Sequence, residues 1–257
     1  MKKASEILKR KAGRIVESVK ASELLSQKRA TALSFAYPCD GHIDAVLSNG
    51  LVRKSLQLFS DKYCKRQIQN IKTTGQLVTS GNYPRLYKIL QGCCESLKIT
   101  TLPDVYITPQ LSGINALSVG TDAHPIVMVS RKAVMCLSDG ELRFLLGHEL
   151  GHILQQNMMC HTIKGVLDMI NDKSAALGVI VSDLIDIPLN KWYRCAEFTA
   201  DKAGYICCGD IASVKSIFGK TARHRSESGY GDFMELYQNH PLVKTRIEKI
   251  EEFAKTM

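Results

Sequence analysis

The chain has 257 residues, of which 45% are hydrophobic and 23% are charged, with 34 Lys and Arg against 25 Asp and Glu. This apolar content excludes an intrinsically disordered chain, and the length suits one large domain or two small ones. The formal net charge of +9 raises nucleic acid and anionic membrane surfaces as possible partners.

The excess positive charge is concentrated at the N-terminus. Residues 1–30 hold nine Lys or Arg and three Glu, which leaves residues 31–257 nearly balanced. The alternation of charged and apolar residues predicts an amphipathic helix that either packs on its own domain or makes peripheral contact with a membrane. We therefore divide the chain into a basic helical segment, residues 1–30, and a single domain, residues 31–257. Nucleic acid is not an expected partner, because no nucleic-acid-binding motif is present.

Cysteine usage and hydropathy predict the compartment. The nine cysteines are odd in number, include two adjacent pairs and form no CxxC, so a secreted disulfide framework is not expected. The N-terminus lacks the apolar core of a signal peptide, and the longest apolar run, residues 175–181, is far shorter than the roughly 20 residues of a membrane span. We expect a cytoplasmic protein without a transmembrane span.

The predicted elements change character along the chain. The first hundred residues read as mostly helical, with breaks near residues 37–41, 49–50 and 73–84, and a helix begins near Pro84. Short β-branched segments at 105–108, 116–119 and 126–130 then predict a small sheet. Ser138 and Glu141 have capping-box spacing before a long, buried helix that reaches about Met159. Another helix is predicted over 189–208, with more helices to the end. The fold class is therefore α+β, mainly helical with a small sheet.

The central helix contains His148, Glu149 and His152 in the order HExxH. The i, i+4 spacing places both imidazoles on one helix face, within reach of one Zn²⁺ ion. Glu149 follows the first histidine directly and can act as a general base toward water. Two histidines and a glutamate inside an otherwise apolar helix would be costly to bury without a ligand.

A catalytic zinc site needs a third protein ligand. The metzincin pattern is excluded because Gln155 and Met158 occupy its glycine and histidine positions. Glu197 and Asp201 also lie i, i+4 on a predicted helix, next to small residues that allow close helix packing. One carboxylate can bind the metal while the other orients a ligand histidine. We predict Glu197 as the third ligand.

These motifs resemble peptidase family M48, a gluzincin family of zinc metallopeptidases. The similarity covers about residues 85–250, and its matching residues are Asn115, Ala116, Gly120, Glu141, Leu142, the run 147–152, Trp192, Tyr193, Arg194, Glu197, Ala200, Asp201, Ala203, Gly204, His240, Pro241, Arg246 and Ile247. The resemblance implies a zincin-like fold with one Zn²⁺ per chain on His148, His152 and Glu197. It also implies Glu149 as catalytic base and Asp201 behind the metal ligands.

The same resemblance implies a substrate site. The segment from Asn115 to Gly120 forms an edge strand beside the active-site cleft in the family, so Asn115, Ala116 and Leu117 are expected to bind an extended polypeptide. The oxyanion that develops during hydrolysis needs a donor, for which His240 is the first choice and Arg246 the second. His240 could equally be a helix-capping or turn residue before Pro241.

Two functions remain open at this stage. The first is a zinc endopeptidase that hydrolyses extended or unfolded polypeptide. The second is a latent or non-proteolytic, chaperone-like binding module that keeps zinc for structure or regulation. Glu149 favours the enzyme, because a structural zinc site does not need a base.

Overall fold

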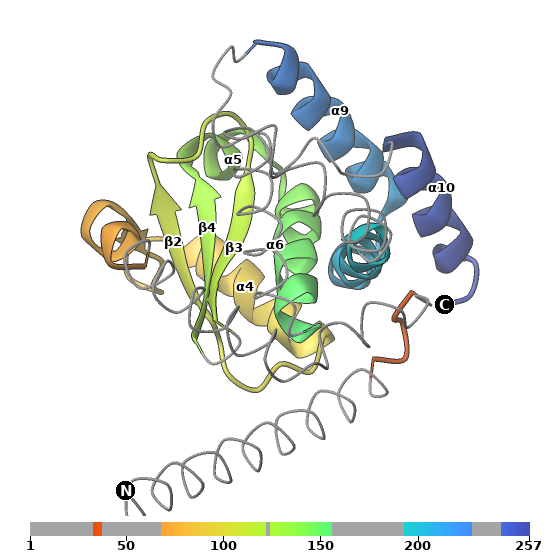
Figure 1. Ribbon diagram of the computed structural model, residues 1–257, viewed down its shortest axis with the longest axis horizontal. Coiled ribbons are helices and arrows are strands. Elements are labelled where there is room, and N and C mark those ends of the chain that lie inside the picture. The colour runs from red at the N-terminus through yellow and green to blue at the C-terminus, as the bar shows by residue number, and fades with distance from the viewer. Residues whose placement is uncertain (1–32, 38–67, 122–123, 156–192, 228–242) are drawn as a thin grey trace, which may run out of the picture.

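The structure is a computed structural model that describes residues 33–37, 68–121, 124–155, 193–227 and 243–257 (Figure 1). The basic segment 1–30, His240 and the first four residues of the helix predicted over 189–208 lie outside the described residues. No helix in the described ranges has the length and apolar character that crossing a membrane requires.

The sheet has four strands in the order β1-β2-β4-β3, with β1 spanning Gln76–Leu77, β2 Asp104–Thr108, β3 Ala116–Thr121 and β4 His124–Ser130. Strands β2 and β4 are parallel, whereas β1 and β3 pair with them antiparallel. The three predicted strands are confirmed, and β3 stands at the end of the strand order, as expected of an edge strand. The helical break predicted over residues 73–84 contains β1, a two-residue strand that the sequence did not predict.

The helices are α4 (Pro84–Ser96), α5 (Arg131–Cys136), α6 (Asp139–Leu154), α9 (Ile211–Glu227) and α10 (Val243–Ala254). Residues 68–74 and 193–208 are also helical. The start at Pro84 is confirmed, and α6 ends at Leu154, earlier than predicted. Figure 1 shows the helix of residues 193–208 between α6 and α10. The mainly helical α+β class is therefore confirmed.

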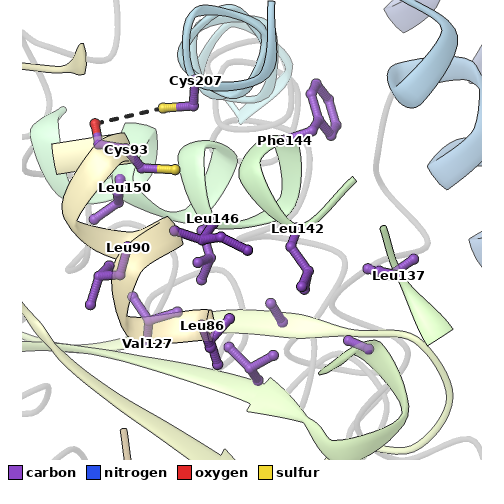
Figure 2. Packing of buried hydrophobic residues seen from close by; sticks show 14 of the residues in the cluster. Leu86, Leu90, Cys93, Val127, Leu137, Leu142, Phe144, Leu146, Leu150 and Cys207 are labelled. Atoms are coloured by element: carbon purple, nitrogen blue, oxygen red, sulfur yellow. Dashed lines mark hydrogen bonds between the residues drawn. The ribbon is translucent and has the colours of Figure 1, made fainter. Parts of the chain in front are cut away.

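Successive side chains of each strand point to opposite faces of the sheet, so each face carries its own hydrophobic cluster. The face toward α4 and α6 carries the larger cluster, which Figure 2 shows through Leu86, Leu90, Val127, Leu142, Leu146 and Leu150. The opposite face carries Tyr106, Ile126 and Met128, which pack against Ile71 of the helix at 68–74. Helix α6 is thus held between the sheet and the C-terminal helices, and its central turns are buried.

The start of α6 is fixed by the predicted capping box. The Ser138 hydroxyl accepts from the Glu141 backbone N–H at 3.3 Å, and the Glu141 carboxylate accepts from the Ser138 N–H at 2.7 Å. Ser216 and Lys220 of α9 also donate to this carboxylate at 2.6 and 2.7 Å. Burial opposes its ionisation, but the bonds from Lys220, Ser216 and Ser138 lower the pKa of Glu141 to about 2. This charged anchor joins the beginning of α6 to α9.

Helix α6 and the helix of residues 193–208 approach each other closely at small residues. A Cβ added to Gly151 would lie 2.8 Å from Ala200 Cα and 2.8 Å from Ala203 Cβ. One added to Gly147 would lie 2.7 Å from the Cys207 sulfur. No real side chain fits at such distances unless the helices separate. The backbones can therefore approach only because glycines face the neighbouring helix.

We predict that Gly151→Ala lowers the free energy of unfolding by about 1–3 kcal/mol, because overpacking outweighs the better helix propensity of alanine. Gly219→Ala in α9 is the matched control, since nothing lies within 4 Å of its added Cβ. The control should be neutral or more stable by up to about 1 kcal/mol. Urea denaturation measures both variants. Equal stability of Gly151→Ala and Gly219→Ala would contradict the close packing.

Candidate metal centre

Three potential metal ligands converge where α6 faces the helix of residues 193–208. The Nε2 atoms of His148 and His152 lie 3.1 Å apart. Glu197 approaches them with Oε2 3.7 Å from His148 Nε2 and Oε1 3.3 Å from His152 Nε2. The donor atoms of a tetrahedral zinc site with bonds of about 2.0–2.1 Å are separated by about 3.3 Å. The three side chains therefore lie close enough together to hold one metal ion.

The site is buried, and its nitrogen and oxygen donors suit a metal ion of borderline softness such as zinc. Glu197 is 0% exposed and His148 and His152 are 7% and 5% exposed. These three form a group of histidine and carboxylate side chains that could hold a metal ion within the described residues. Two imidazoles and one carboxylate are the ligand set of one class of catalytic zinc sites, which leave a fourth position for water or substrate.

A buried carboxylate orients the first histidine. Asp201 Oδ1 lies 3.0 Å from His148 Nδ1 and can accept a hydrogen bond from Nδ1–H, which leaves Nε2 to present its lone pair to the site. Burial opposes the charged imidazole, but the bond to Asp201 and the negative charge of Glu197 give a net rise in the pKa of His148. A cation bound at Nε2 would compete directly with the proton that Nε2 carries in the charged imidazole.

Arg246 of α10 holds this carboxylate from behind. Its guanidinium donates to Asp201 from Nε at 2.7 Å and from Nη2 at 2.6 Å, and Nη2 lies 3.6 Å from Glu197 Oε2. Burial raises the pKa of Asp201, but the guanidinium and the bond from His148 outweigh this effect and lower it. The Arg246 charge also lies 4.7 Å from the centroid of the Phe218 ring. All the residues that make these contacts are buried.

The structure brings some of the predicted residues together and separates others. Arg246, predicted to bind substrate, lies instead behind the metal ligands with its guanidinium on Asp201.

Leu117 points its side chain to the opposite face of the sheet, against the cluster around Ile71. Ala116 lies in the core on the α6 side, and Asn115 precedes β3, with its carbonyl accepting from the Ser130 N–H at 2.9 Å. Their roles in substrate binding stay predictions.

Glu149 has a partner that sequence reasoning missed. The Ser118 hydroxyl of β3 donates to Glu149 Oε2 at 2.6 Å and lies 3.1 Å from the Glu149 carbonyl oxygen. Glu149 is 4% exposed. The sequence could have indicated this contact only through strand alternation: Ser118 follows Ala116 by two residues and therefore lies on the same face of the strand.

A short N-terminal segment also docks on the helix that carries Glu197. The Tyr37 backbone N–H donates to the Thr199 hydroxyl at 3.0 Å, and its ring centroid lies 4.9 Å from that of Phe198. Lys202 of the same helix lies 5.3 Å from the Tyr37 ring centroid. Residues 33–37 thus contact the helix between Glu197 and Asp201, which the sequence did not predict.

The model of peptidase family M48 matches residues 81–254, which include every residue of the centre described above. The chain belongs to peptidase family M48. Its M48 match begins after Tyr37, so the docked segment at 33–37 lies outside the family region.

Curated relatives of this M48 protein are distant in sequence. The chloroplastic "Plastoglobule-localized metallopeptidase 48" of Arabidopsis thaliana is 28% identical over 60% of this chain and 44% of its own length. A "Protease HtpX homolog" of Burkholderia thailandensis is 23% identical over 77% of this chain and 82% of its own length. Another, from Nostoc punctiforme, is 29% identical over 56% of this chain and 50% of its own length. The chain thus spans half or less of the plant and Nostoc proteins. No solved structure matches it.

We predict that Asp201→Asn weakens zinc affinity about 10- to 100-fold, the usual cost of losing a carboxylate that orients a ligand histidine. The variant also removes the carboxylate that makes both close hydrogen bonds to the buried Arg246 and leaves only Glu197, 3.6 Å away, as a counter-charge, so the free energy of unfolding should fall by about 3 kcal/mol. Competition with a chromogenic chelator measures the affinity.

Asp210→Asn is the matched control. This exposed aspartate caps α9 by accepting from the Ala212 and Ser213 N–H groups at 3.0 and 2.9 Å, and asparagine caps equally well. Its zinc affinity should equal that of the wild type. An unchanged affinity in Asp201→Asn as well would show that Asp201 does not support the metal ligands.

Proposed function

We propose that this M48 protein is a zinc-dependent endopeptidase that hydrolyses peptide bonds of extended or unfolded polypeptide in the cytoplasm. The observation that carries the proposal is the convergence of His148, His152 and Glu197 at ligand spacing, with the Glu149 carboxylate adjacent on the same helix. These three side chains would hold one Zn²⁺ ion per chain.

A zinc ion bound there would lower the pKa of a water molecule and polarise the scissile carbonyl. Glu149 accepts the proton of the attacking water and delivers it to the leaving amine nitrogen. Asp201 and Arg246 keep the His148 ring in the orientation that directs Nε2 toward the site. His240 remains the proposed donor to the developing oxyanion and lies outside the described residues.

Strand β3 is the proposed support for the substrate. The Ser130 N–H donates to the Asn115 carbonyl, so the carbonyl of residue 115 points toward β4, next to the register that pairs Ala116 with Val129. By alternation Leu117 directs its backbone groups toward β4, whereas Ser118 directs its N–H and C=O away from β4. An extended peptide laid antiparallel to β3 can pair with Ser118 beside the Glu149 carboxylate.

Burial of Glu149 against Ser118 favours the enzyme over the chaperone-like module. A structural zinc site gains nothing from an extra buried carboxylate beside two of its ligands, whereas peptide hydrolysis needs a base at that position. The names of the curated relatives point the same way, since they denote proteases and a metallopeptidase.

We predict that Glu149→Gln keeps one zinc per chain and lowers kcat for an unfolded polypeptide by about 10²- to 10⁴-fold, the usual contribution of a general base. Glu95→Gln on the exposed surface of α4 makes the same chemical change away from the site and should be as active as the wild type. Zinc content and cleavage are measured on the same preparations. Full cleavage by Glu149→Gln with zinc retained would rule out the proposed mechanism.

We also predict a positional effect in the substrate. In a series of peptides with one cleavage site, N-methylation of the amide that faces the Ser118 carbonyl should raise KM about 2- to 10-fold, because one hydrogen bond is lost. Methylation of the amides on either side, which point away from β3, should leave KM nearly unchanged. A KM that is the same for every methylated position would contradict pairing with β3.

A further inference from the structure

The side chain and the backbone of Ser118 point toward different parts of the site. Its side chain faces α6, its backbone groups face away from β4, and the residue as a whole is 8% exposed. Its strand neighbours Leu117 and Val119 pack on the opposite face of the sheet. Among the described residues of β3, Ser118 alone donates a side-chain hydrogen bond to the carboxylate of Glu149.

The hydrogen bond itself is of the strong type. The Ser118 Oγ to Glu149 Oε2 distance of 2.6 Å is typical of a hydroxyl that donates to an ionised carboxylate, which makes shorter bonds than a neutral acceptor. The Glu149 carbonyl, 3.1 Å from the same oxygen, is the weaker partner because a hydroxyl has a single proton. The carboxylate is therefore held by one of its two oxygens.

Within the described ranges, the side-chain hydrogen bond of the Glu149 carboxylate goes to Oε2, and Oε1 takes no part in it. A glutamate side chain has three rotatable bonds, and a base that moves among several rotamers spends little time in its productive geometry. Holding Oε2 restricts those rotamers and leaves Oε1 to exchange a proton.

We propose that Ser118 is a positioning residue for the Glu149 base. It fixes the carboxylate through Oε2 and, from the same residue, offers backbone groups to the peptide. The spacing between the bound substrate strand and the base is thereby set within one residue of β3. This inference rests on the proposed peptidase function, because it assigns the positioning of a base in that reaction.

The test compares Ser118→Val with Ser118→Thr. These side chains have nearly the same shape and both suit a strand, but only threonine keeps the hydroxyl. We expect Ser118→Val to lower kcat about 10- to 100-fold with KM within about twofold of the wild type, because peptide pairing uses the backbone. Ser118→Thr should recover most of the loss. Zinc content and zinc affinity should be the same in all three proteins.

Ser96→Ala is the control for loss of a serine hydroxyl elsewhere, since Ser96 is exposed at the end of α4 and donates only to the Gly92 carbonyl. Its kcat and KM should equal those of the wild type. A Ser118→Val variant with wild-type kcat, in a preparation whose wild type is active, would overturn the positioning role and leave the peptidase function intact. An inactive zinc-loaded wild type would instead remove the proposed function, and the inference with it.

Crystal structures of the wild type and Ser118→Val provide a readout independent of turnover. We expect the Glu149 carboxylate to stay against Ser118 in the wild type and to leave that position, or occupy several rotamers, in Ser118→Val. The backbone of β3 should be unchanged. A Glu149 carboxylate that keeps its position without the hydroxyl would overturn the inference whatever the activity.

Discussion

The close contact between α6 and the helix of residues 193–208 is the constraint on which the site depends. Two histidines on α6 cannot form the candidate metal centre by themselves, because the carboxylate that completes the group belongs to another helix. Glu197 can reach them only if the two backbones approach more closely than ordinary side chains permit. Gly147 and Gly151 remove the Cβ atoms that would keep the helices apart. The metal-site geometry is thus a consequence of packing at positions that carry no chemistry.

The centre is then supported from two sides by buried polar contacts. Behind it, α10 contributes Arg246, whose two hydrogen bonds to Asp201 fix the carboxylate that orients His148. In front of it, β3 contributes Ser118, which holds Glu149. An ion pair at this depth is weak evidence for stability, since removing two charges from water is costly. Its value lies in the single arrangement that it imposes on the ligands.

The sequence predicted those parts of the fold and the site that local patterns encode. Pro84, the Ser138–Glu141 capping box and the β-branched segments specify their own elements, and the spacings in HExxH and ExxxD place the candidate side chains on one face of each helix. Strand β1 has only two residues and exists through pairing with β2, so its own sequence carries no strand pattern. The contacts of Ser118 and Arg246 join residues 31 and 45 positions apart, and only the tertiary fold determines such contacts.

The proposed centre binds zinc through two imidazoles and one carboxylate, in a chain that also offers nine cysteines. X-ray absorption spectroscopy of the protein loaded with one equivalent of zinc tests this claim directly. We expect a first shell of nitrogen and oxygen atoms at about 2.0–2.1 Å, with the scattering of two imidazole rings and no sulfur. A sulfur shell at about 2.3 Å would place zinc on cysteine thiolates and contradict the proposed centre.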